Sequence, residues 1–214
     1  MFDTLIQTAK AGQNALVLGL GGGMTANLLT EKNYKVTAVE FDERIISVSK
    51  KYFNLNDQAE IHCADARYYL NKIEKKYDLI LFDLYNAEEQ PCHVLTTESL
   101  QKLKQNLNDS AMIYINWHGF TDEGIGDGSA LLYNTLKYSG FNISLCSKSE
   151  NQNYRNIIFV CSLMQMDKLP YLIHDKFTVN SFLNTDDKPM LESFNAEANK
   201  SWRTNYLKYY QNNK

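Results

Sequence analysis

The stretch Val17-Leu-Gly-Leu-Gly-Gly-Gly-Met-Thr25 decides the fold, because an apolar run passes directly into a cluster of glycines. Residues 15–20 carry no polar side chain, as expected for a parallel strand that is covered on both faces. A helical pattern begins at Met24, so the glycines lie in a strand-to-helix turn. Glycine lets such a turn be tight and lets a ligand approach the backbone closely. We therefore expect a ligand-binding loop at the end of the first strand.

The same strand-helix alternation continues through the next 140 or so residues. It predicts a doubly wound, mostly parallel seven-stranded sheet with helices on both faces, an α/β fold. The last two strands lie close together across a polar loop, which predicts an antiparallel edge strand. The expected strands after the first are 35–40, 60–63, 78–82, 111–117, 141–147 and 156–163, and the expected helices are 24–31, 44–53, 66–75, 97–107 and 129–138.

Two regions differ in composition. Residues 1–164 hold the alternating pattern and are predicted to form one Rossmann-like catalytic domain. Residues 165–214 are more polar and include Pro170 and Pro189, so we expect a helical extension packed on that domain. The first strand begins close to Met1, and no preceding domain is expected.

Composition and charge exclude several classes of function. The chain has 214 residues, of which 44% are hydrophobic and 22% charged, and its net charge is -3. No basic excess is available for a nucleic-acid backbone, and no apolar run is long enough to span a membrane. Residues 1–13 do not resemble a secretory signal, so none is expected. The four cysteines and four histidines lack metal-ligand spacing, so no metal site is expected. We expect a cytoplasmic protein without a nucleic-acid or membrane partner.

The glycine loop and the next strand favour a nucleoside ligand. Gly19 and Gly21 match the start of a dinucleotide fingerprint, but Met24 stands at its last glycine position and counts against NAD. Glu40 closes the second strand, where a carboxylate can accept hydrogen bonds from both ribose hydroxyls. The alternative interpretation of Glu40 is a surface carboxylate at a strand end.

Two more carboxylates follow the third and fourth strands. Asp65 can receive the amino group of an adenine, and it can also cap the helix that begins at Ala66; the two roles are compatible. Asp83 follows the fourth strand directly. Carboxyl ends of parallel strands meet at one edge of a sheet, so Gly21, Glu40, Asp65 and Asp83 predict a site for an adenosine ligand without phosphates.

The runs 17–25, 36–42, 65–66 and 77–83 together resemble the spermidine synthase family, which has the class I methyltransferase fold. The resemblance covers roughly residues 13–163, and Thr185-Asp-Asp-Lys-Pro189 is similar to the tail of spermidine synthase-like proteins. It implies S-adenosylmethionine or its decarboxylated form as co-substrate. It also implies that Glu40 holds the ribose, Asp65 and Ala66 hold the adenine, and Asp83 is catalytic. The predicted binding residues are Gly19, Gly21, Gly22, Glu40, Phe41, Asp65, Ala66 and Asp83, and the predicted catalytic residues are Asp83 and Tyr85.

The chain departs from the family pattern at three places. Met24 stands where the family has an aspartate for the amino end of the co-substrate, and Asp83-Leu-Tyr-Asn-Ala87 keeps only the first aspartate of the family motif. The family's small N-terminal β domain, which completes the polyamine pocket, is also expected to be missing. Methyl transfer and aminopropyl transfer therefore both stay open.

The chemistry expected at Asp83 is proton removal from an amine that attacks the activated carbon. Tyr85 and Asn86 are candidate donors or acceptors beside it, although Tyr85 could equally serve in packing. Glu88 and Glu89 attract a cationic amine or form a solvated acidic loop. Trp117 and His118 line the acceptor site or pack in the core, and the aromatic tail from Trp202 predicts a docked terminal helix or a subunit contact.

Three functions follow in order of preference. The first is a transferase that moves a methyl or aminopropyl group to a small acceptor, expected to be a cationic amine. The second is a non-catalytic nucleoside-binding or partner module with the same fold. The third is an NAD-dependent oxidoreductase. Whether the chain forms a homodimer, as family members often do, is left open.

Overall fold

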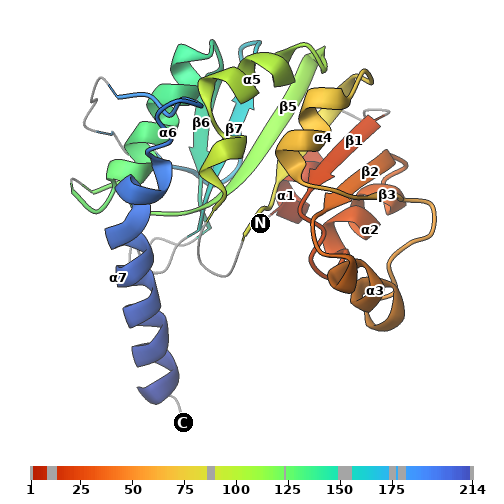
Figure 1. Ribbon diagram of the computed structural model, residues 1–214, viewed down its shortest axis with the longest axis horizontal. Helices are drawn as coiled ribbons and strands as arrows, with labels where there is room; N and C mark the ends of the chain where they lie inside the picture. Colours follow the sequence, from red (N-terminus) through yellow and green to blue (C-terminus); the bar gives the residue numbers. More distant parts are fainter. Residues whose placement is uncertain are drawn as a thin grey trace.

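The computed structural model describes residues 2–8, 14–85, 90–122, 124–148, 156–173, 177 and 182–212. They form one sheet with helices on both faces (Figure 1). The strands are β1 (Asn14–Leu18), β2 (Lys35–Glu40), β3 (Glu60–Cys63), β4 (Tyr77–Phe82), β5 (Leu107–His118), β6 (Asn142–Cys146), β7 (Asn156–Ser162) and β8 (Leu172–Ile173). The helices are α1 (Phe2–Thr8), α2 (Met24–Glu31), α3 (Glu43–Tyr52), α4 (Ala66–Lys72), the 3-10 helix η1 (Cys92–Val94), α5 (Thr97–Lys104), α6 (Asp127–Tyr138) and α7 (Leu191–Asn212).

The strand order is β3-β2-β1-β4-β5-β7-β6-β8. Strands β1 to β5 run parallel, and β7 lies antiparallel between β5 and β6. The prediction of a mostly parallel α/β sheet is confirmed, and each of the seven expected strands is present. The structure adds β8, which pairs antiparallel with β6 at the edge. Two residues carry no periodic signal, so the sequence could not predict this strand.

The core has one half on each face of the sheet, because side chains alternate along every strand. In β1, Leu16 and Leu18 face the cluster that contains residues of α4, α5, α6 and α7. Ala15 and Val17 face the opposite cluster, which contains residues of α1, α2 and α3. Strand β1 is therefore buried on both faces, and the ends of the central strands lie at a rigid edge of the sheet.

The starts of α3, α4 and α5 are fixed by side-chain caps. Asp42 accepts a hydrogen bond from the Arg44 amide at the start of α3, and Thr96 caps α5 through the Ser99 amide. Such caps each contribute about 1 kcal/mol. They also fix the points at which the chain leaves the sheet edge and enters a helix.

The C-terminal extension contacts the sheet domain in two ways. Strand β8 joins the sheet edge, and the start of α7 packs on α6 and β5. The rest of α7 runs away from the sheet toward the C-terminus (Figure 1). Among the helices that the structure describes, none combines the length and the apolar character needed to cross a bilayer.

Candidate active site at the carboxyl ends of the strands

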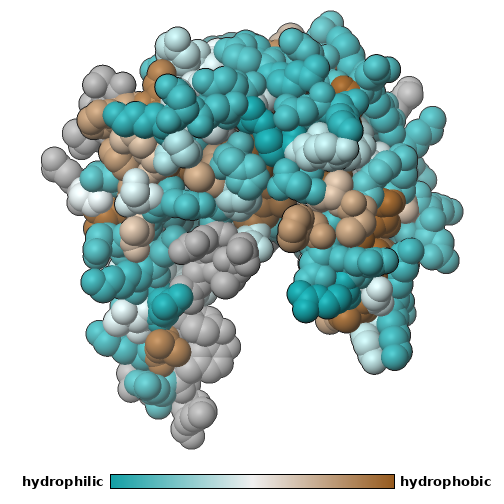
Figure 2. Space-filling model, in the orientation of Figure 1, coloured by the Kyte–Doolittle hydropathy of each residue, from teal (hydrophilic) through white to brown (hydrophobic). Residues whose placement is uncertain are grey.

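The predicted site residues follow four neighbouring strands. Leu18 of β1 lies in register with Val39 of β2 and with Phe82 of β4, and Glu40 lies in register with Cys63 of β3. The chain therefore brings Asp65, Glu40, the glycine loop and Asp83 out at one edge, which is called the rim below. Figure 2 shows the molecule hollowed between the α7 side and the α2–α3 side.

The glycine loop passes directly over the start of the segment after β4. Gly19 has a φ of +89°, and a Cβ on it would lie 2.2 Å from the carbonyl oxygen of Asp83. Only glycine permits both the left-handed backbone and this approach. At Gly21, with a φ of +51°, an added Cβ would meet nothing within 4 Å, so this part of the loop has an open side. A Cβ on Gly22 would contact the Phe53 ring at 3.3 Å.

The Glu40 carboxylate holds the glycine loop to the end of β2. One oxygen accepts a hydrogen bond from the Leu20 amide at 3.0 Å, and the other accepts one from the Asp42 amide at 3.1 Å. Each carboxylate oxygen has two acceptor positions, so both can still accept a hydroxyl. Phe41, the next residue, has a side chain that is 77% exposed. An aromatic ring left in solvent beside a carboxylate is an available surface for a flat ligand.

Asp65 caps α4 through the Tyr68 amide at 2.8 Å, and Ala66 is the buried first residue of that helix. The second carboxylate oxygen of Asp65 lies 3.2 Å from Nε2 of His93. The sequence predicted the cap but not His93, which lies in η1, 28 residues further along the chain. The imidazole orients the Asp65 carboxylate at the rim.

Asp83 accepts a hydrogen bond from Nδ2 of Asn116 at 2.8 Å. Burial raises the pKa of the Asp83 carboxyl, while the Asn116 hydrogen bond acts in the opposite direction. A carboxylate with a raised pKa is a stronger base than one in water. Asp83 thus has the environment that proton removal from an amine needs.

Tyr85 is held by two neighbours. Its hydroxyl donates to the carbonyl oxygen of Asn116 at 2.9 Å and accepts from Nε2 of Gln90 at 2.8 Å. Burial raises the pKa of the Tyr85 phenol well above its usual range, so the hydroxyl keeps its proton. The Tyr85 ring packs on His118 with centroids 4.4 Å apart, and His118 stacks on Trp202 of α7 at 5.1 Å.

Two buried amide oxygens at this place have no hydrogen-bond partner among the described residues: Oε1 of Gln90 and Oδ1 of Asn116. Their orientation is fixed, because the amide nitrogens donate to groups that can only accept, the Asn116 carbonyl and the Asp83 carboxylate. Both residues line one small pocket beyond β4 and β5. The pocket is lined by Phe82, Leu84, Gln90, Pro91, Leu95, Ile115 and Asn116.

Several acceptor-side predictions have different outcomes. Trp117 is buried and donates from Nε1 to Ser129, so it packs in the core, whereas His118 on the other face of β5 packs against Tyr85. Asn86, Glu88 and Glu89 lie outside the described residues. Asn116 and Gln90 were not predicted from the sequence. Asn116 directly follows the apolar run of β5, and this position could have indicated it. Gln90 lies in a loop, where no local pattern marks it.

Comparison with known proteins agrees with this geometry. The family model described as "Spermine/spermidine synthase domain" matches residues 4–118, more than half of the chain. The chain belongs to the spermine/spermidine synthase family. The resemblance read from the motifs is thus confirmed, as is the class I methyltransferase-like fold. The match includes β1 to β5 and hence the whole rim, but it ends before α6 and the C-terminal extension.

Relatives of this family member span both kinds of transfer. A polyamine aminopropyltransferase of Vibrio vulnificus is 29% identical over 147 residues, which are 65% of this chain and 48% of that protein. An N-terminal histidine N-methyltransferase of Emericella nidulans is 33% identical over 119 residues, 53% of this chain and 21% of that protein. The chain thus spans less than half the length of these two relatives.

A solved structure shares the fold over nearly the full chain. Human methyltransferase-like protein 13, determined in complex with SAH, has a TM-score of 0.62 and 19% identity, and the match covers 94% of this chain and 84% of that one. At this identity the likeness concerns the fold alone. Within the described part of the chain, no group of three or more His, Cys, Asp or Glu side chains is arranged for a metal ion.

Proposed function

We propose that this family member is a transferase that moves an alkyl group from an S-adenosyl sulfonium to an amine. The observation that carries the proposal is the partly buried Asp83 carboxylate, which accepts from the Asn116 side chain, together with the buried Oδ1 atom of that side chain, which has no hydrogen-bond partner among the described residues. A neutral primary amine has two N–H groups, one for the Asn116 oxygen and one for the Asp83 carboxylate, and a lone pair for the attack. A thiol has one proton and a carboxylate has none, so neither supplies a donor for the Asn116 oxygen once the Asp83 carboxylate is served.

The rim residues fit an adenosyl group. Gly21 has an open side, the Glu40 oxygens keep acceptor positions for hydroxyls, and Phe41 exposes a ring on which a purine can pack. We propose that Asp65 accepts a hydrogen bond from the amino group of the adenine, through the carboxylate oxygen that contacts His93. Gly19, Gly22 and Ala66 serve this site through the backbone that they shape. These assignments rest on the described contacts and on family membership.

Asp83 is the proposed base. When bound, the sulfonium co-substrate supplies an activated carbon. Asp83 and Asn116 hold the amine with its lone pair directed at that carbon, and Asp83 accepts the amine proton as the carbon–nitrogen bond forms. The carbon–sulfur bond breaks with its electron pair on sulfur. Positioning of this kind can supply about 7–11 kcal/mol of the barrier, and general-base action about 10²- to 10⁴-fold in rate.

Tyr85 is proposed to orient the site and not to transfer a proton. The Tyr85 hydroxyl forms hydrogen bonds with Asn116 and Gln90. Its raised pKa keeps the phenol protonated, so it cannot accept the amine proton. The phenol thereby fixes the Gln90 amide, so that the Oε1 atom of Gln90 stays directed away from the Asn116 carbonyl.

Between the two co-substrates, the loop favours intact S-adenosylmethionine and thus methyl transfer. Met24 is 76% exposed at the start of α2, and the first turn of that helix contains no acidic residue. The described residues of this turn therefore provide no carboxylate for an isolated ammonium group. A co-substrate that carries its own carboxylate beside the ammonium needs none. An N-methyltransferase is found among the relatives beside the aminopropyltransferases, so methyl transfer has a precedent among them.

The test is a calorimetric titration with S-adenosylmethionine, decarboxylated S-adenosylmethionine and NAD, followed by mass spectrometry of amine acceptors. Primary diamines and peptides with a free N-terminal amine form the acceptor panel. We expect binding of the adenosyl sulfonium compounds, no binding of NAD, and a mass gain on an amine. Binding without any mass gain would favour a non-catalytic nucleoside-binding module, and binding of NAD alone would overturn the proposal.

A further inference from the structure

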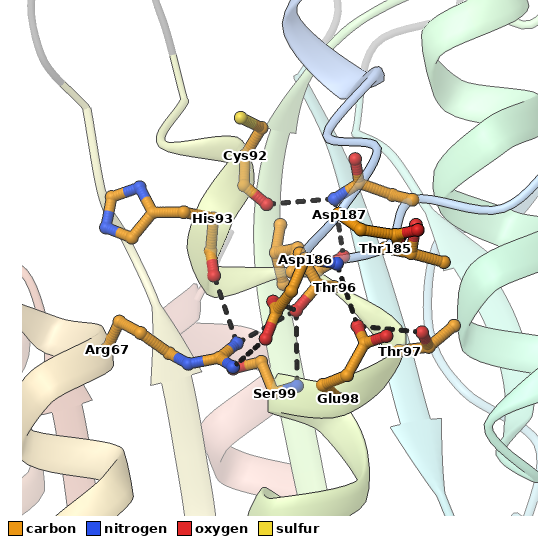
Figure 3. A network of polar contacts seen from close by, with 12 residues as sticks. Arg67, Cys92, His93, Thr96, Thr97, Glu98, Ser99, Thr185, Asp186 and Asp187 are labelled. Carbon is orange, nitrogen blue, oxygen red and sulfur yellow. Dashed lines mark hydrogen bonds and ion pairs between the residues drawn. The ribbon is translucent and has the colours of Figure 1, made fainter.

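The segment before α7 lies against η1 and the start of α5 (Figure 3). Its buried Asn184 donates from Nδ2 to the carbonyl oxygens of Cys92 and Leu95, at 2.9 and 3.0 Å. The Oδ1 atom of the same residue accepts the amides of Met190 and Leu191 at the start of α7. One fully buried amide thus ties the C-terminal segment to η1 at one end and to α7 at the other.

Asp186 continues this attachment with a charge. Its Oδ1 accepts from the Thr96 hydroxyl at 2.6 Å, and its Oδ2 forms an ion pair with Arg67 of α4 at 2.7 Å. Its backbone amide donates to Oε2 of Glu98 at 3.0 Å. Charge-assisted hydrogen bonds of this kind are the stronger class, and the Arg67 side chain is 18% exposed, which limits competition from water.

Arg67 transmits this anchor to the rim. Besides Asp186, its guanidinium donates to the Thr96 hydroxyl at 2.8 Å and to the carbonyl oxygen of His93 at 3.1 Å. Figure 3 shows the Arg67 guanidinium between the His93 carbonyl and the Asp186 carboxylate. The His93 backbone is therefore held at its carbonyl by Arg67, while its imidazole contacts Asp65.

We infer that Asp186 is a positioning residue for the adenosyl site, acting through Arg67 and His93 on the Asp65 carboxylate. The inference rests on the proposed function, because it gives Asp65 the adenine as its ligand. The C-terminal segment then contributes to ligand binding at the site, in addition to covering the sheet. Loss of the Asp186 charge releases Arg67 from one of its three acceptors, so the guanidinium is held less firmly against the His93 carbonyl.

The neighbouring residue offers a matched control. Asp187 is adjacent in the chain and exposed, and its carboxylate accepts from the Thr185 hydroxyl within the same turn. The two substitutions Asp186→Asn and Asp187→Asn remove the same charge one residue apart. Only the first removes a carboxylate that contacts α4 and the start of α5.

The experiment measures calorimetric binding of methylthioadenosine, which has the adenosyl group but no amino-acid end, to the parent chain and to both variants. Measurements are made well below each melting temperature. We expect the dissociation constant to rise about three- to tenfold for Asp186→Asn and to stay within about twofold for Asp187→Asn. An unchanged constant for Asp186→Asn, with or without a lower melting temperature, would show a structural role alone and overturn the inference.

A second variant keeps the test valid if Asp186→Asn fails to fold. His93 has an exposed side chain, so His93→Ala removes the imidazole without opening the core. We expect it to weaken methylthioadenosine binding as much as Asp186→Asn, and the double variant to be no weaker than either, because both act at Asp65. Parent-like binding by His93→Ala would contradict the inference. If the parent chain itself does not bind methylthioadenosine, the proposed function fails first.

Discussion

Asn116 donates from Nδ2 to Oδ1 of Asp83 across 2.8 Å, so the end of β5 holds the carboxylate at the end of β4. The two strands are parallel neighbours, and Phe82 lies in register with Ile115. The contact therefore follows from strand pairing, one residue beyond the register pair on each strand. It stabilises the charged form of a carboxylate that burial would otherwise favour as the neutral acid.

Replacing Asp83 by Asn should abolish most turnover while leaving co-substrate binding intact. The variant keeps the shape of the side chain but cannot accept the amine proton. We expect kcat to fall about 10²- to 10⁴-fold, with a dissociation constant for S-adenosylmethionine within about twofold of the parent. Steady-state methyl transfer and calorimetry measure the two quantities. Parent-like turnover would leave Asp83 without a role as base.

Removing the Asn116 amide should shift the acid limb of the profile of kcat/KM against pH to higher pH. The Asn116 hydrogen bond lowers the Asp83 pKa against the effect of burial, so Asn116→Ala should raise that pKa further. The base is active when deprotonated, and kcat/KM should therefore begin to fall at a higher pH than in the parent.

The matched control for this profile is Asn108→Ala. Asn108 donates to Asp78 at the other end of the same two strands, far along them from the rim. We expect its acid limb to coincide with that of the parent. A limb that stays in place in Asn116→Ala, or that moves equally in Asn108→Ala, would contradict the role assigned to the Asn116 contact.

His118 should make the protein less stable in acid. Burial lowers the pKa of its imidazole from 6.5 to about 4, so the unfolded chain takes up a proton at a higher pH than the folded chain does. The stabilisation is complete above pH 6.5 and is lost as the pH falls through the range between 6.5 and about 4. The Tyr85 and Trp202 rings that enclose His118 offer no carboxylate to compensate the charge.

Melting curves from pH 7 to pH 4 test this point. We expect His118→Gln to reduce the loss of melting temperature across that range, since the glutamine does not titrate. His62 has a partly exposed side chain, and His62→Gln serves as the comparison for the loss of a histidine outside the core. Equal pH dependence in His118→Gln and the parent would show that other groups cause the acid instability.

Met24 should influence the choice of co-substrate. Met24→Asp places a carboxylate at the exposed start of α2, where a helix N-terminus also tolerates negative charge. We expect the affinity for decarboxylated S-adenosylmethionine to rise relative to the intact form by about two- to tenfold, because the new carboxylate can pair with an ammonium group and repels a carboxylate. Competition calorimetry measures the ratio. Met24→Asn is the neutral control, and an equal change in both variants would exclude an effect of charge.

The sequence predicted the parts of this molecule that local patterns determine. The apolar runs located β1 to β7, and strand ends placed Glu40, Asp65 and Asp83 at one edge, because parallel strands share a direction. Gln90 and Asp186 could not be found in this way. Their contacts with Asn116 and Arg67 join segments 26 and 119 residues apart. Such contacts depend on how loops cross the sheet. The motif at residues 185–189 marked the neighbourhood of Asp186, but it did not indicate Arg67 as the partner.

Gly19 should be the least replaceable residue of the glycine loop. An alanine there would have to adopt a φ of +89° with its Cβ 2.2 Å from the Asp83 carbonyl oxygen, so either the loop or the segment after β4 must move. We expect Gly19→Ala to lower the free energy of unfolding by about 2–4 kcal/mol and to reduce turnover through displacement of Asp83. Gly21→Ala has open space and should cost only about 1 kcal/mol, while weakening adenosyl binding on the open side. Denaturant unfolding and calorimetry separate the two effects. Equal stability losses in the two variants would show that the approach to Asp83 does not constrain the loop.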